Sequence, residues 1–104
     1  MRRGEVWWAE LPAPAGRRPV VLLSRNEAYA VRELVIVAPL TSRIRRIPTE
    51  VALGRADGLP RRCVANLDSV TTIPKRALTQ RLTSLSTEKL AAVERALRFA
   101  VGLL

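Results

Sequence analysis

GRRPVVLLS (residues 16–24) and VAPLTSR (residues 37–43) are two apolar, strand-forming runs with polar ends. In the first run two arginines precede the apolar residues, and in the second two hydroxyl residues and an arginine follow them. If the two runs pair in one sheet, guanidinium and hydroxyl donors can meet at the same rim of that sheet. Such a rim is a natural place to hold a phosphate group.

The rest of the chain predicts further short strands, because apolar and β-branched residues cluster in runs that turn residues separate. Two prolines and a glycine in residues 11–16 indicate a loop. Residues 25–32 fit a short helical turn, residues 54–60 are rich in turn formers, and residues 77–82 fit either a helical turn or a strand. Strands are predicted at residues 6–11, 19–24, 34–38, 49–53, 63–68 and 70–73.

The C-terminal segment predicts an amphipathic helix. Ser86 is a good N-cap, and apolar residues then recur at spacings of three and four. They are Leu90, Val93, Leu97, Val101 and Leu104. Several short strands followed by one helix indicate a mainly β fold, an antiparallel barrel or curled sheet with the helix packed against it. The length of 104 residues fits one domain over residues 1–104.

The charge balance indicates a polyanionic partner. The chain carries 18 basic and 9 acidic residues, for a net charge of +9, and only Lys75 and Lys89 of the basic residues are lysine. Arginine presents a planar fork of donors that matches phosphate. A GC-rich genome also explains the choice of arginine over lysine, but it does not explain the excess of positive charge. Nucleic acid is the partner that this composition favours.

Residue types that are missing or rare exclude several classes of site. The chain has no histidine, which excludes a histidine general base and histidine metal ligands. Its one cysteine, Cys63, excludes an intrachain disulfide and a CxxC metal site. No uncharged stretch approaches the roughly 20 apolar residues of a membrane span, and the N-terminus lacks the apolar segment of a signal peptide. We therefore expect a cytoplasmic protein that does not enter a membrane.

The order of these segments resembles the MazF/PemK-type toxin endoribonucleases over essentially the whole chain. The family has a first strand like residues 3–11, an arginine-proline followed by a valine-rich strand like residues 17–24, and an apolar strand ending in a hydroxyl residue like residues 37–42. The later strand and the C-terminal helix fit as well. The resemblance implies a homodimer of SH3-like barrels that cuts single-stranded RNA without a metal or cofactor. It also implies a cognate acidic antitoxin that blocks the site.

The resemblance assigns roles to four residues. Arg18 matches the family's catalytic arginine and Thr41 its catalytic hydroxyl residue, while Glu10 stands where many members carry an aspartate. Asp68 stands where an acidic or amide residue is usual and is expected to bind RNA. The group that takes the proton of the RNA 2′-hydroxyl stays open among Glu10, Asp68 and Arg18 itself. Thr71 departs from the family, because many relatives carry an arginine near that position.

Arg17, Ser42 and Arg43 are expected to bind RNA beside the catalytic pair. Each has an ordinary alternative, since paired arginines beside a loop often form a solvated rim and hydroxyls at a strand end often cap a turn. Trp7 and Trp8 point to opposite faces of a strand, so one of them faces outward as an interface residue or as a platform for base stacking.

Two other function classes compete with the nuclease. A CcdB-like toxin that binds gyrase has the same fold, but a phosphate-facing pair such as Arg18 and Thr41 argues against it. A non-catalytic RNA-binding module is the other alternative, and the aromatic content of 4% offers it few stacking platforms.

Overall fold

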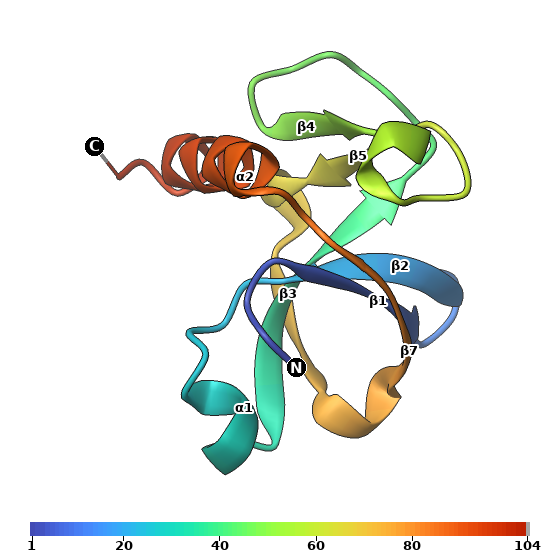
Figure 1. The fold of residues 1–104 in the computed structure, drawn as a ribbon, viewed down its shortest axis with the longest axis vertical. Helices are drawn as coiled ribbons and strands as arrows, with labels where there is room; N and C mark the ends of the chain where they lie inside the picture. Colours follow the sequence, from blue (N-terminus) through green and yellow to red (C-terminus); the bar gives the residue numbers. More distant parts are fainter. Residues whose placement is uncertain (104) are drawn as a thin grey trace.

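The computed structural model describes residues 1–103 as a strongly curled antiparallel sheet with one long helix near the C-terminal end (Figure 1). This confirms the predicted fold class. The strands are β1 (Glu5–Glu10), β2 (Arg17–Leu22), β3 (Leu34–Thr41), β4 (Glu50–Leu53), β5 (Cys63–Asn66), β6 (Thr71–Pro74) and β7 (Leu78–Ser84). The helices are α1 (Ala28–Val31) and α2 (Thr87–Ala100), with 3₁₀ turns η1 (Arg55–Asp57), η2 (Leu67–Ser69) and η3 (Lys75–Ala77).

Strand β3 joins the two parts of the sheet. The strands follow the order β4-β5-β3-β2-β1-β7, and β6 pairs with the first half of β3. β3 pairs with β2 from Val37 to Pro39, and its last two residues, Leu40 and Thr41, pair with β5 instead. In Figure 1 β4 and β5 therefore lie above β1 and β2, and β3 runs from the lower level to the upper one.

Two apolar clusters fill the interior, and neighbouring residues of β2 point into different clusters. Val21 belongs to the cluster shared with β4, β5 and α2, while Val20 and Leu22 belong to the cluster shared with β6 and β7. Successive side chains on a strand face opposite sides, so a strand covered on both faces needs a continuous apolar run. This explains why the sequence of β2 does not alternate between apolar and polar residues.

The helix α2 begins as the sequence predicts. The Ser86 hydroxyl accepts a hydrogen bond from the Lys89 amide at 3.1 Å, which is an N-cap contact. The helix packs on β4 and η2 and buries Val93 and Ala96. Val101 is 56% exposed rather than part of the buried face, because the helix ends one residue before it. Leu104, placed on the same face by the sequence pattern, lies outside the described residues.

The strand ends differ from the prediction at two places that matter for the site. β2 begins at Arg17 rather than Pro19, since Arg17 and Arg18 pair with Glu10 and Ala9 in the β1–β2 hairpin. β3 continues beyond Ala38 to Thr41. The ambiguous segment around residues 77–82 becomes β7, which pairs with β1. Within residues 1–103 no helix is both long and apolar enough to span a membrane.

Gly58 holds the β4–β5 loop against β7. Its φ is 89°, in the left-handed region, and a Cβ built on it lies 2.8 Å from the Thr83 Cβ. Gly58→Ala therefore combines backbone strain with a steric clash, and we expect it to lower the unfolding free energy by about 2–4 kcal/mol. Urea denaturation measures this change.

Gly16→Ala is the matched control. Gly16 also has a positive φ, 64°, but nothing lies within 4 Å of its added Cβ. Gly16→Ala should therefore lower the unfolding free energy by the backbone strain alone, about 1–2 kcal/mol. In the Gly58→Ala background, Thr83→Gly removes the Thr83 Cβ that the new methyl group meets, so it should recover the part of the loss that comes from the clash. Equal losses in the two glycine variants would contradict the proposed contact.

Candidate active site

A pocket of about 590 Å³ opens where the β1–β2 hairpin, the end of β3 and the β4–β5 loop meet. The hairpin contributes one aromatic and two cationic side chains, the last residue of β3 and the residue after it contribute two hydroxyls, and the loop contributes an apolar wall. The lining residues are Trp8, Arg17, Arg18, Pro19, Leu40, Thr41, Ser42, Leu59, Pro60, Arg61 and Cys63. The pocket thus combines phosphate-binding donors with apolar surface.

The strand register brings Arg18 and Thr41 to the same pocket. Val20 pairs with Pro39 at the end of the β2–β3 ladder. Continuing that register by two residues sets Arg18 opposite Thr41 and keeps both side chains on one face. The β2–β3 ladder ends at Pro39 and Thr41 pairs with Val64 of β5, so the pocket lies beyond the end of the ladder.

Arg18 is held at its inner end by the loop before it. Its Nε donates a hydrogen bond to the Ala15 carbonyl at 3.2 Å, and the side chain is partly buried. This bond fixes the guanidinium plane but uses neither of the two terminal nitrogens. Those nitrogens can therefore donate to two oxygens of one phosphate.

Thr41 carries its hydroxyl to the pocket from the last residue of β3. The Oγ1 atom accepts a hydrogen bond from the Arg43 amide at 3.2 Å. The hydroxyl hydrogen is therefore free to donate to a ligand. Ser42 also lines the pocket, whereas the Arg43 side chain does not.

The two tryptophans lie in different surroundings, and these show which of them faces outward. Trp7 packs against the lower apolar cluster, and its Nε1 donates to Glu5 at 2.9 Å. Trp8 lines the pocket, and the Arg17 guanidinium carbon lies 4.0 Å from the centre of its ring. Trp8 is thus the tryptophan available to a ligand.

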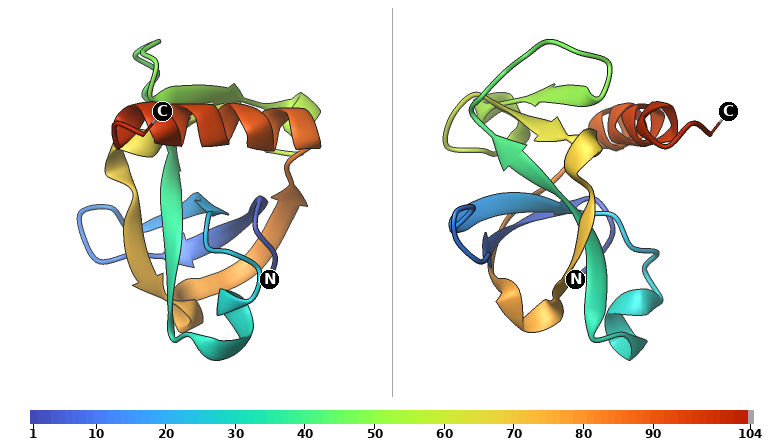
Figure 2. Two further views of the ribbon diagram at one scale, coloured as in Figure 1. Left: turned by 90° about the vertical axis from the view of Figure 1, so that its left-hand side faces the viewer. Right: turned by 180° about the vertical axis from the view of Figure 1, so that it is seen from behind.

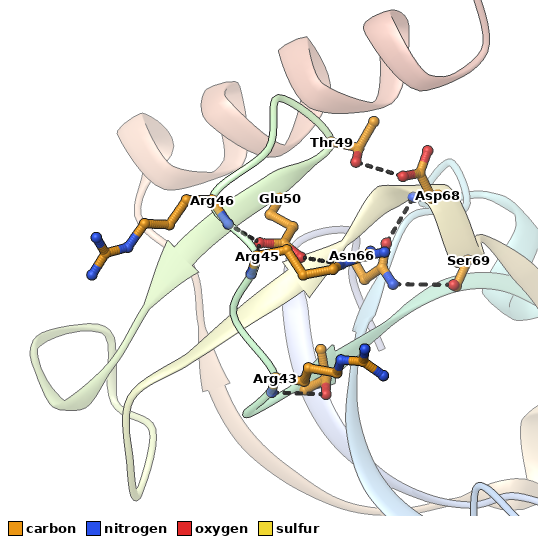
Figure 3. A network of polar contacts seen from close by, with 9 residues as sticks. Arg43, Arg45, Arg46, Thr49, Glu50, Asn66, Asp68 and Ser69 are labelled. Carbon is orange, nitrogen blue, oxygen red and sulfur yellow. Dashed lines mark hydrogen bonds and ion pairs between the residues drawn. The ribbon is translucent and has the colours of Figure 1, made fainter.

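Glu10 and Asp68 are not among the residues that line the pocket. Glu10 is exposed at the end of β1, where its Oε1 lies 3.5 Å from the Arg17 Nε. Asp68 lies on η2 and accepts a hydrogen bond from the Thr49 hydroxyl at 2.6 Å, as Figure 3 shows. That contact ties η2 to the start of β4, so Asp68 has a structural partner away from Arg18 and Thr41.

An arginine-rich loop between β3 and β4 is folded around Glu50. The Glu50 carboxylate accepts hydrogen bonds from the Arg45 and Arg46 amides, both at 2.9 Å, and from the Arg45 Nε at 3.0 Å (Figure 3). Arg46 adopts a positive φ of 58° in this turn. Burial alone would raise the pKa of Glu50, but these hydrogen bonds outweigh it and lower the pKa below its usual value.

The β4–β5 loop completes the pocket, and of its residues the sequence indicates only Arg61 and Arg62, as contacts to the RNA backbone. Leu59 and Pro60 supply apolar wall, and Arg61 supplies a further cation. Cys63 is buried and also lines the pocket; burial raises the pKa of its thiol, and Asp57 adds to the effect. No local pattern marks the apolar residues of this loop as part of a site, because only folding brings them to residues roughly 20 to 50 positions earlier. Among the described residues no three Cys, Asp or Glu side chains gather as a metal site.

Comparisons with known proteins agree on one group. A family model described as the PemK-like, MazF-like toxin of type II toxin–antitoxin systems matches residues 2–101. A probable endoribonuclease of Mycobacterium tuberculosis, MazF5, is 45% identical over 95% of this chain and 91% of its own length.

Two solved structures share the fold. A mycobacterial endoribonuclease in complex with its cognate antitoxin superimposes with a TM-score of 0.90, at 30% identity over 100% of this chain and 97% of its own. The M. tuberculosis toxin MazF-mt6 gives 0.88, at 29% identity over 96% and 98%.

Glu50→Gln tests the carboxylate that organises the arginine-rich loop. Because the pKa of Glu50 is lowered in the folded protein, its charge stabilises the fold above the ordinary value of 4.5. This stabilisation is lost as the pH falls through the lowered pKa. At neutral pH the variant should lose about 1–2 kcal/mol of unfolding free energy.

Urea midpoints at neutral pH and at about pH 3 measure the effect, and the difference between wild type and Glu50→Gln should shrink at the lower pH. Glu27→Gln is the control, since Glu27 is exposed and makes no side-chain capping bond. A gap between wild type and Glu50→Gln that does not change with pH would rule out the charge as its source.

Proposed function

The chain belongs to the PemK-like, MazF-like toxins of type II toxin–antitoxin systems, and from this premise we propose that it is an endoribonuclease whose active site is the pocket around Arg18 and Thr41. The observation that carries the proposal is the convergence of this guanidinium and this hydroxyl in one pocket. Homologues named as endoribonucleases support the activity. They favour it over the gyrase-binding toxin and the non-catalytic RNA-binding module.

The proposed reaction uses the RNA itself as the nucleophile. The 2′-oxygen attacks the adjacent phosphorus, and the bond from phosphorus to the 5′-oxygen breaks. The products are a 2′,3′-cyclic phosphate and a 5′-hydroxyl, whose oxygen takes its proton from solvent water as it leaves. Charge grows on the non-bridging oxygens in the transition state, so the catalytic groups must donate hydrogen bonds there. The two terminal nitrogens of Arg18 fit this task, and the Thr41 hydroxyl supplies one more donor.

Glu10 is our candidate for the group that accepts the 2′-proton. Residues two apart on a strand share a face, so Glu10 points to the same side of β1 as Trp8, which lines the pocket. Glu10 also contacts Arg17, the neighbour of Arg18. Asp68 is less suited to this role because its carboxylate is occupied by Thr49. A positioned general base contributes about 10²–10⁴-fold to the rate.

The same surface suits two polyanionic partners. The net charge of +9 attracts single-stranded RNA, for which Arg17, Ser42 and Arg43 would supply contacts to the backbone. It equally attracts a short acidic antitoxin segment that folds as it binds. Because its substrate is cellular RNA, we place the protein in the cytoplasm.

We also infer a homodimer. Large apolar side chains stay exposed on β3 and around the end of α2: Leu34, Ile36, Phe99, Val101 and Leu103. In the left view of Figure 2, α2 crosses above β3 and β6 on the face turned to the viewer. A second copy covering this face would remove that apolar surface from water.

Arg18→Ala and Thr41→Val test the active site. Each removes a donor to the transition state while leaving the buried core of both strands unchanged, and each should reduce cleavage by at least about 10²-fold. Arg18→Lys should recover little, because an ammonium cannot make the paired hydrogen bonds of a guanidinium. Purified proteins incubated with labelled single-stranded RNA in EDTA give the rates.

Arg32→Ala is the charge-matched control, because Arg32 is exposed just after α1, far from the β4–β5 loop in Figure 1. If Arg18→Ala cuts RNA as fast as Arg32→Ala does, the assignment of the active site is wrong.

Phe99→Asp tests the dimer. The Phe99 side chain is 63% exposed, so a charge there costs the fold little but opposes burial against a second copy. Sedimentation over a range of concentrations should show a weaker dimer for Phe99→Asp and an unchanged one for Phe99→Leu. Equal association of both variants would place the interface elsewhere.

A further inference from the structure

Trp8 and Arg17 form a stacked pair at the pocket that the proposed cleavage chemistry does not use. The Arg17 guanidinium carbon lies 4.0 Å from the centre of the Trp8 ring. Both side chains line the pocket beside Arg18. Both tryptophans are partly buried, but Trp7 packs against the apolar cluster and donates a hydrogen bond to Glu5, whereas Trp8 does not.

We propose that Trp8 stacks on a nucleobase of the bound RNA. Arg17, which lies over the Trp8 ring in this structure, then moves to a backbone phosphate. The proposal rests on the pocket being the RNA site. It adds a base-binding residue to a phosphate-binding pair, so the pocket would hold the base next to the scissile phosphate.

The shape and chemistry of the pocket fit a base. The space of about 590 Å³ is within the usual range for small-molecule sites. Leu40, Leu59 and Pro60 give it an apolar wall, which a flat aromatic ring can contact. Arg18 lines the same pocket, so a base on Trp8 and a phosphate on Arg18 can belong to neighbouring parts of one strand.

The relative strengths of the contacts favour the exchange. An exposed cation–π contact contributes only about 2- to 5-fold to an equilibrium. The exposed Arg17–Glu10 ion pair, at 3.5 Å, adds up to about 5-fold. A base stacked on an aromatic ring contributes about 5- to 150-fold, and Arg17 gains charge-assisted hydrogen bonds once it reaches a phosphate. RNA therefore offers each partner a stronger contact than the one it gives up.

The exchange also has a consequence for Glu10. Arg17 holds the Glu10 carboxylate in this structure. When Arg17 turns to a phosphate, Glu10 loses its partner on the pocket side of β1. Binding of RNA would thus release the carboxylate that we propose as the proton acceptor.

A deoxyribose oligonucleotide of about six nucleotides tests the stacking, because it has bases and phosphates but no 2′-hydroxyl to be cleaved. It should quench the tryptophan fluorescence of the wild type and of Trp7→Phe, but not that of Trp8→Phe. Trp8→Phe keeps an aromatic ring and should bind nearly as well as the wild type. Trp8→Ala should bind about 5- to 150-fold more weakly.

A series of oligonucleotides with one abasic position separates base stacking from phosphate contacts. At the position whose base stacks on Trp8, removing the base should weaken binding to the wild type. The same removal should not weaken binding to Trp8→Ala any further, because that variant has already lost the stacking contact. Two results would overturn the role of Trp8. One is quenching that persists in Trp8→Phe, and the other is a loss of affinity on removing a base that is as large in Trp8→Ala as in the wild type at every position. If Trp8→Ala fails to fold, the comparison of Trp8→Phe with the wild type still decides.

Salt dependence tests the movement of Arg17. If Arg17 pairs with a phosphate in the complex, Arg17→Ala should lower the slope of log K against log salt by about 0.7, and Arg32→Ala should not change it. An unchanged slope in Arg17→Ala would show that Arg17 does not reach a phosphate. Cleavage of labelled RNA is a separate readout: a wild type that binds the oligonucleotide but cuts no RNA would contradict the nuclease, not the stacking.

Discussion

The change of partner by β3 is the constraint on which the rest of the structure depends. Up to Pro39 the strand is hydrogen-bonded to β2, and from Leu40 it is hydrogen-bonded to β5. In the strand order β3 lies between β5 and β2, so the β2 ladder ends at Pro39 while β5 pairs with the residues of β3 beyond it. The pocket lies where the β2–β3 ladder ends, and the register of that ladder sets Arg18 across from Thr41. The site is therefore a direct result of how the sheet is curled.

The β4–β5 loop closes the pocket on its third side, and its position depends on the opposite end of the chain. Gly58 packs directly on Thr83 of β7, and β7 pairs with β1 of the hairpin that carries Trp8. β7 thus contacts the loop that supplies the apolar wall and pairs with the strand that carries Trp8. The pocket is held by long-range contacts rather than by the local conformation of any one loop.

The arginines that give the chain its basic character have two kinds of role. Some stabilise the fold: Arg3 pairs with Glu94 of α2, and Arg45 is bound by Glu50. Arg17, Arg18 and Arg61 line the pocket instead. A net charge of +9 is a sound indication of a polyanionic partner, but it does not say which arginines meet that partner.

The sequence by itself determined the mainly β class, most strands and the capped helix, and through a family resemblance it predicted that Arg18 and Thr41 share one site, where both line the same pocket. These features depend on local patterns, such as continuous apolar runs, turn residues and the Ser86 cap. Only the tertiary structure decided that Trp8 rather than Trp7 lines the pocket, that Asp68 is bound to Thr49, and that residues 59–61 form a wall of the site. The physical reason is that the face on which a strand residue lies depends on register. Register is fixed by contacts between segments far apart in the chain, and a shift of one residue exchanges the two faces.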